Sequence, residues 1–228
     1  SATLNQAHVR WRNDDGGETG ESGGGSFRTG SNVSAQATST NTLIIPNVNV
    51  PSDASNSILV VVAATEHDTE GVHPLPATVT WGTNSLSKAV EHYVDDSGNT
   101  YSCSVAIWIL RRPTLNQTKD VTITFNTTAL RTSSSAFIIE NVADADAEAT
   151  ATKAAEDASP TNTNITTVSS DAFIIDAFVT GATTTISTSQ SGQNERIEYP
   201  GESHIHGVSD KQGPGTPGAT TLSWNCDS

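Results

Sequence analysis

The chain of 228 residues carries 25 acidic and 11 basic side chains, which gives a formal net charge of −14 and a pI near 4.6. Eleven scattered cations cannot form the basic surface that phosphates require, so no nucleic-acid partner is expected. No apolar run approaches the roughly 18 residues of a membrane helix, so no transmembrane segment is expected. Methionine is absent, which predicts a chain that begins after a processing event such as removal of a signal peptide.

The first thirty residues combine a strand pattern with a glycine-rich tether. Between Ala7 and Arg12 apolar and polar residues alternate, which predicts a strand. Its apolar face would hold Ala7, Val9 and Trp11, and its polar face His8, Arg10 and Arg12. Residues 13–30 contain seven glycines and five charged residues, a composition typical of a flexible linker. We therefore expect an N-terminal arm over residues 1–30 and a β domain over 31–228.

The body opens with two contrasting strand patterns and a hairpin. In Asn41–Val50, Pro46 predicts a bulge or an edge position because proline has no N–H to donate. Ser57–Thr65 (SILVVVAAT) is nearly continuous in apolar residues, as expected for a strand buried on both faces. After a charged loop, Ala77–Trp81 and Leu86–Val94 flank a turn and predict the hairpin.

The second half repeats short strand patterns separated by turns. Tyr101–Leu110 alternates between a face with Cys103, Val105, Ile107 and Ile109 and a face with Ser102, Ser104, Ala106 and Trp108. Further strands are expected at Lys119–Asn126, Ser135–Val142, Asp171–Thr180 and Ala219–Cys226, and shorter ones at Thr161–Ser170, Thr183–Ser189 and Glu195–Tyr199. Ala143–Ser159 is expected to be a long surface loop, and Gly201–Gly218 a further loop. Ten or eleven short strands predict an all-β fold, a jelly-roll-like β-sandwich with an extended N-terminal strand arm.

Two cysteines, Cys103 and Cys226, are too far apart in sequence for a CxxC redox or zinc motif. An even count in an exported chain favours one disulfide between them, and two thiols facing the core are the alternative.

Several residues are weak candidates for metal binding. His204 and His206 flank Ile205, so a strand would place both imidazoles on one face, as in a zinc or copper pair. A third ligand would have to come from His67, Asp68 or His73. Two acidic groups present oxygens of the kind that calcium binds, Asp144, Asp146 and Glu148, and Asn13, Asp14 and Asp15. Solvated histidines and acidic loops are the simpler interpretation, so no cofactor is expected, with calcium as the alternative.

Catalytic motifs are missing from the sequence. It contains no GxSxG, HExxH, P-loop or dinucleotide-binding pattern, so we expect a protein that is not an enzyme. The aromatic residues Trp81, Trp108, Tyr93 and Tyr199 could form a platform that stacks on sugars, although Trp108 belongs to a strand expected to be buried. Glycans are therefore an alternative partner.

The segment QAHVRWRNDDGGE at Gln6–Glu18 resembles the opening of many bacterial secreted surface proteins, with Val9 in place of the usual aromatic residue. The body resembles a jelly-roll domain of exported bacterial surface proteins, through SILVVV, VTWGTNSL, VAIWIL, VTITF and DAFIIDAFV. The resemblance implies an extracellular or cell-surface location and no catalytic residues. In such domains another apolar strand follows the LSW strand, whereas this chain ends at Ser228, so the body is expected to lack one strand.

An unfilled sheet position would leave unpaired backbone groups and an apolar groove. The arm has the length and alternation to fill it, with Leu4, Ala7, Val9, Trp11 and Arg12 as the expected contact residues. Donation of this strand to a neighbour would make a homopolymer, an extracellular filament or a biofilm-like surface matrix. The alternative is a monomeric carbohydrate-binding or adhesive module in which the arm pairs with its own domain.

Overall fold

The computed structural model describes residues 3–11, 25–95, 101–142, 149–156, 161–167, 172–181 and 185–226. These residues form sixteen β-strands and no helix, so none of them provides a membrane-spanning helix. The strands are β1 (Thr3–Trp11), β2 (Ser26–Phe27), β3 (Val33–Val50), β4 (Ile58–His67), β5 (Pro76–Trp81), β6 (Asn84–Ser85), β7 (Ser87–Asp95), β8 (Ser102–Arg111), β9 (Gln117–Glu140), β10 (Ala149–Glu156), β11 (Thr161–Thr166), β12 (Phe173–Thr180), β13 (Ile186–Thr188), β14 (Gln193–Pro200), β15 (Ile205–Gln212) and β16 (Ala219–Cys226).

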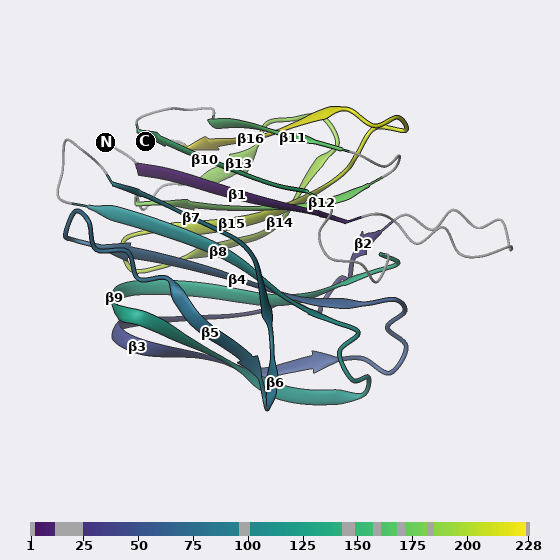
Figure 1. The fold of residues 1–228 in the computed structure, drawn as a ribbon, viewed down its shortest axis with the longest axis horizontal. Coiled ribbons are helices and arrows are strands. Elements are labelled where there is room, and N and C mark those ends of the chain that lie inside the picture. Colours follow the sequence, from purple (N-terminus) through teal and green to yellow (C-terminus); the bar gives the residue numbers. More distant parts are fainter. Residues whose placement is uncertain are drawn as a thin grey trace, which may run out of the picture.

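The strands form three sheets that lie on top of one another (Figure 1). The large sheet has the order β6-β5-β9-β4-β8-β7, with β2 and β3 also paired to β9. The inner sheet has the order β10-β1-β12-β15-β14, and the outer sheet the order β11-β16-β13. Every pairing is antiparallel in the described part of the chain. The predicted all-β, jelly-roll-like sandwich is therefore confirmed as a fold class.

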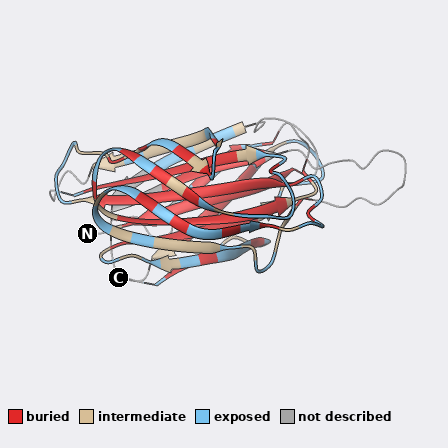
Figure 2. Ribbon diagram, turned by 90° about the horizontal axis from the view of Figure 1, so that it is seen from below, coloured by how far each residue is buried: buried red, intermediate tan, exposed pale blue. Residues whose placement is uncertain are grey.

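The middle of the molecule is buried on both faces of its strands, as the red segments of Figure 2 show. In β4, Ile58, Val60, Val62 and Ala64 face the inner sheet, whereas Leu59, Val61 and Ala63 face β3 and β5. This explains why SILVVVAAT has no polar alternation, because neither face of β4 meets water. In β8 the predicted alternation is confirmed, with Cys103, Val105 and Ile107 on the inner-sheet side and Ala106 and Trp108 on the other.

The strand β9 links the two halves of the large sheet. Its C-terminal half pairs with β4, and its N-terminal half pairs with β5, while β3 follows it over almost its whole length. The β3 ladder shifts register between Ile45 and Val48, so the bulge predicted at Pro46 is confirmed. A bulge bends the strand locally, which lets the β3–β9 ribbon curve around the second hydrophobic cluster.

Four predictions about the strand layout change in the structure. Residues 149–156 and 205–212, both expected in loops, form β10 and β15. Ser26–Phe27, expected in the linker, form β2 and pair with β9, while residues 12–24 lie outside the described residues. The arm was expected to fill a position beside the C-terminal strand, but that strand, β16, is flanked by β11 and β13. β1 instead lies between β10 and β12 in the inner sheet.

Candidate strand-binding site

The N-terminal strand β1 is a central strand of the inner sheet. It pairs with β10 on one side, from Thr3–Glu156 to Arg10–Ala149, and with β12 on the other, from Leu4–Thr180 to Trp11–Phe173. No ladder joins β10 to β12 directly in the described chain, and β10 has β1 as its only ladder partner there. The position of β1 is therefore a groove between two strands, which we call the β10–β12 groove.

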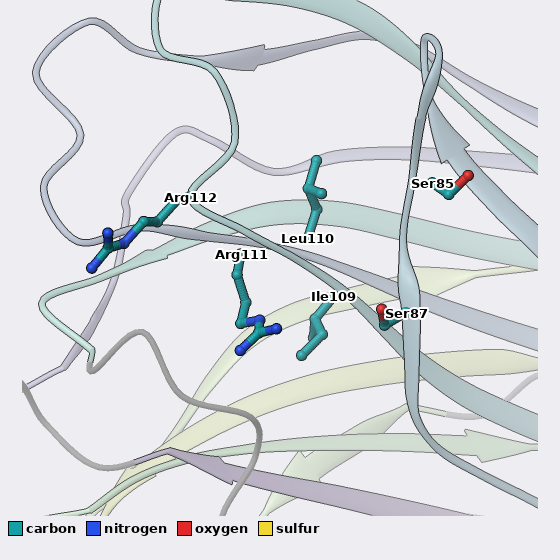
Figure 3. Close-up of a pocket in the computed structure, with 6 residues that line it drawn as sticks. All are labelled: Ser85, Ser87, Ile109, Leu110, Arg111 and Arg112. Carbon is teal, nitrogen blue, oxygen red and sulfur yellow. The ribbon is translucent and has the colours of Figure 1, made fainter.

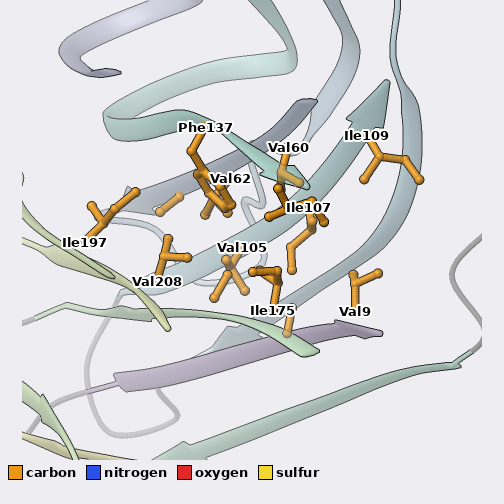
Figure 4. Packing of buried hydrophobic residues seen from close by; sticks show 14 of the residues in the cluster. Val9, Val60, Val62, Val105, Ile107, Ile109, Phe137, Ile175, Ile197 and Val208 are labelled. Atoms are coloured by element: carbon orange, nitrogen blue, oxygen red, sulfur yellow. The ribbon is translucent and has the colours of Figure 1, made fainter. Parts of the chain in front are cut away.

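The apolar face of β1 lies against the main hydrophobic cluster. Ala7 and Val9 are fully buried in it, together with Ile175 of β12 and Val105 and Ile107 of β8 (Figure 4). Complete burial of a valine-sized side chain contributes about 1.5–3 kcal/mol relative to exposure. Two of the residues predicted to contact the groove, Ala7 and Val9, therefore lie in it.

The other predicted contact residues are only partly described. Leu4 and Trp11 belong to the β1 ladder through their backbones, and their side chains lie outside the described residues. Arg12 lies wholly outside them.

The polar face of β1 is buried as well, which sequence reasoning missed. Gln6, His8 and Arg10 have no exposed surface, because the outer sheet covers this side of the inner sheet. The Thr163 Oγ1 of β11 donates to Gln6 Oε1 at 2.7 Å, and Arg10 Nη1 donates to the Thr166 carbonyl at 3.4 Å. The groove is thus closed on both faces, and its occupant contacts all three layers near it.

A buried carboxylate, Asp176 of β12, lies at the centre of the polar side. Its Oδ2 accepts hydrogen bonds from Trp224 Nε1 at 2.5 Å, Gln6 Nε2 at 3.1 Å, Gln193 Nε2 at 3.2 Å and Ser209 Oγ at 3.2 Å. His8 Nδ1 lies 3.1 Å from its Oδ1. Charged side chains are almost never fully buried unless they have such partners. The acid inside the apolar run AFIIDAFV is the sequence signal that could have revealed this site.

The candidate metal ligands His204 and His206 form a second buried polar cluster, near β15 and β9. Neither side chain has exposed surface, so the interpretation as solvated histidines is wrong. His204 Nε2 and His206 Nδ1 each lie 2.7 Å from Ser133 Oγ, and His206 Nε2 lies 2.7 Å from Ser135 Oγ. The prediction that the two imidazoles share a face is therefore confirmed by their common serine partner. His204 Nδ1 also lies 3.9 Å from Glu66 Oε2.

Burial shifts the pKa values of this cluster. It lowers the pKa of His206 to about 3, with His204 as a second cause, and it lowers the pKa of His204 to about 4, with Arg131 as a second cause. Burial raises the pKa of Glu66 to about 7, although Arg131 acts in the opposite direction. Both histidines are therefore neutral at pH 7.

Two of the three expected third metal ligands have other partners, whereas the buried Nδ1 of the third, His67, has no hydrogen-bond partner within the described part of the chain. Asp68 accepts from both terminal nitrogens of Arg131, and His73 stacks on Tyr93 with ring centroids 3.9 Å apart. No group of three metal-ligating side chains occurs among the described residues, and the acidic candidates Asp144 and Asp146 lie outside them. Ser133, His204 and Glu66 have the order of a catalytic triad, but all three are buried, so a substrate has no approach to the serine oxygen in this structure.

The remaining predicted groups do not form the expected features. The structure does not contain the expected disulfide. Cys103 lies in the cluster on one side of the inner sheet, whereas Cys226 packs on the cluster at its other side. Two of the four residues expected to form a sugar-stacking platform are buried, whereas Tyr93 is 48% exposed. Trp81 is fully buried and donates to the Val48 carbonyl at 3.1 Å, and Trp108 is buried in the same cluster.

An open pocket of about 370 Å³ lies at the end of β8 (Figure 3). It is lined by Ser85, Ser87, Ile109, Leu110, Arg111 and Arg112. A neighbouring pocket of about 480 Å³ shares Arg112. Both pockets are away from the β10–β12 groove, since neither is lined by residues of β1, β10 or β12.

A comparison of the chain with models of known protein families and with curated proteins found no match.

Proposed function

We propose that this protein is a structural subunit of an extracellular filament or surface matrix, in which β1 of one subunit occupies the β10–β12 groove of the next. The observation that carries the proposal is that β1 joins two strands that have no ladder to each other in the described chain. A strand that completes a sheet by backbone pairing can come from the same subunit or from another copy with identical contacts.

The balance between the closed subunit and the polymer depends on the tether and on concentration. The structure places β1 in its own groove, and residues 12–24 connect it to Gly25. A short tether supplies an effective concentration in the millimolar range, which favours the closed form in dilute solution. High local concentration at a cell surface favours exchange between subunits. Because donor and acceptor surfaces differ, the exchange is head-to-tail, and it leads to an open polymer when the rotation between subunits does not close a ring.

The register of β1 allows a direct test. Ala7 lies opposite Ala177 of β12, and both side chains belong to the main cluster. Cα atoms of directly opposed antiparallel residues are about 4.5–5.5 Å apart, within the range that a disulfide bridges. In a Cys103→Ala, Cys226→Ser background, Ala7→Cys with Ala177→Cys should form a disulfide under oxidation of the native assembly.

Non-reducing electrophoresis distinguishes the two arrangements. Strand exchange gives a ladder of covalent oligomers, whereas a strand in its own groove gives a closed monomer of altered mobility. A matched control pairs Ala7→Cys with Val179→Cys, which lies on the same face of β12 but opposite Asn5, and should cross-link poorly. Closed monomers as the sole product from native material would contradict the filament proposal and favour the monomeric adhesive alternative.

A further inference from the structure

One carboxylate, that of Asp176, contacts polar side chains from four other strands beside the β10–β12 groove. Three of its hydrogen-bond donors, Gln193, Ser209 and Trp224, come from β14, β15 and β16 and belong to the body of the domain. The other two contacts, with Gln6 and His8, come from β1. The bonding of Asp176 is therefore shared between the groove and the strand that enters it.

The contacts from β1 are spaced to match the strand. His8 lies directly opposite Asp176 in the β1–β12 ladder, and Gln6 is two residues away on the same face. Gln6 also accepts from Thr163, so its amide connects the inner sheet to the outer one. A slip of one residue would turn Ala7 and Val9 toward Asp176 and move the polar side chains into the apolar cluster.

A buried carboxylate is costly unless donors surround it. A strand with aliphatic residues at positions 6 and 8 would still fill the apolar side of the groove, but it would remove one donor and one imidazole from Asp176. Each hydrogen bond to a charged group corresponds to about tenfold or more in a binding constant. The polar side of the groove can thus distinguish between strands whose apolar faces are identical.

We propose that Asp176 is a recognition site that selects the strand entering the β10–β12 groove. Its ligand is an alternating β-strand with a hydrogen-bond donor and an imidazole two residues apart on the face opposite its small apolar residues. The N-terminal strand of another copy of this chain meets this condition through Gln6 and His8. The selection of a strand from another copy of the chain rests on the proposed function, whereas the preference of the groove for one strand sequence over another does not.

Peptide exchange measures this preference with the wild-type protein. The full-length chain is unfolded in guanidinium chloride and refolded with millimolar fluorescent peptide of residues 1–13, and the bound peptide is quantified after gel filtration. A peptide with Gln6→Leu and His8→Leu keeps the length and the apolar face, and it should be incorporated at least about tenfold less than the native peptide. The matched control carries Ser1→Leu and Ala2→Leu, which precede β1, and should be incorporated like the native peptide.

The same peptides with an Asp176→Asn protein test whether the carboxylate is the source of the preference. The preference for the native peptide should fall to within about twofold, because asparagine keeps the shape but not the charge. Equal uptake of the native and doubly substituted peptides by the wild-type protein would overturn the proposal, as would a tenfold preference that persists in Asp176→Asn. The peptide arm needs only wild-type protein, so it stays decisive if that variant does not fold. Failure of the disulfide ladder leaves this preference unaffected.

Discussion

At the scale of single residues, buried imidazoles and a buried carboxyl group make the stability of this protein depend on pH. In the folded state His206 has a pKa of about 3 and stays neutral above that pH, whereas an unfolded histidine has a pKa near 6.5. The unfolded state therefore binds more protons between these values, and stability falls as pH decreases through this window. Glu66 has the opposite sign, because its pKa of about 7 lies above the ordinary value of 4.5, so its contribution is lost as pH rises through that interval.

The His206→Gln variant should lose less stability in acid than the wild type. Glutamine keeps a hydrogen-bonding group near Ser133 and Ser135 but takes up no proton. The slope of the unfolding free energy between pH 6.5 and 4.5 should decrease by about one bound proton. Chemical denaturation at several pH values measures this slope.

Glu66→Gln is the control with the opposite sign. It removes a group that is stabilised by acid, so the slope in the same window should increase by about one bound proton. Unchanged slopes in both variants would contradict the assignment of the pH response to this cluster.

At the scale of elements, β10 depends on β1 for its backbone pairing in the described chain. Val9→Lys would place an unpaired charge in the main cluster and should weaken the seating of β1. The amides of Ala149–Glu156 should then exchange with solvent much faster, while those of β4, which lies between β9 and β8, should keep most of their protection.

Hydrogen exchange with mass spectrometry measures both regions in one experiment. Ile44→Lys is a matched control, because Ile44 is 51% exposed on β3 and its replacement should leave both regions unchanged. Equal acceleration in β4 and β10 would indicate global unfolding and contradict the dependence of β10 on β1.

The strands that could be predicted from the sequence are those whose order of apolar and polar residues reflects which of their faces are buried. The unbroken apolar run of β4 and the alternation of β8 identified strands buried on both faces, because each face has its own hydrophobic cluster. β10 (ATATKAAE) was not predicted, since alanine has low strand propensity and its partner β1 is far away in sequence. The Asp176 site was missed for a related reason, because its partners come from four other strands.

At the scale of the whole molecule, the proposed exchange of β1 between subunits depends on the length of the segment that connects β1 to the body. Trp11 and Gln212 lie on opposite sides of Phe173, and the Gln212 side chain donates to the Gly25 carbonyl. Deleting residues 13–24 would leave only Arg12 between Trp11 and Gly25, a reach of at most about 7 Å, which should be too short for β1 to enter its own groove without strain, whereas the residues that line the groove would be unchanged. The fraction of polymer should therefore rise at a given concentration, as expected for strand exchange with shortened hinges. Light scattering after gel filtration measures this fraction.

An insertion of eight Gly-Ser residues at the same position is the matched control. It should leave the closed monomer dominant, because the effective concentration falls only slowly with tether length. A shortened chain that remains a monodisperse, folded monomer would contradict the role assigned to the tether.

The double pairing of β1 also has a mechanical consequence. Eight residue pairs on each side hold this strand antiparallel between β10 and β12. In an assembly joined through β1, tension along the strand would act parallel to it, so both ladders would be sheared and their hydrogen bonds would share the force. A strand peeled from one end would lose those bonds in turn. Joints of this geometry would allow a filament without covalent links between subunits to resist pulling along its length.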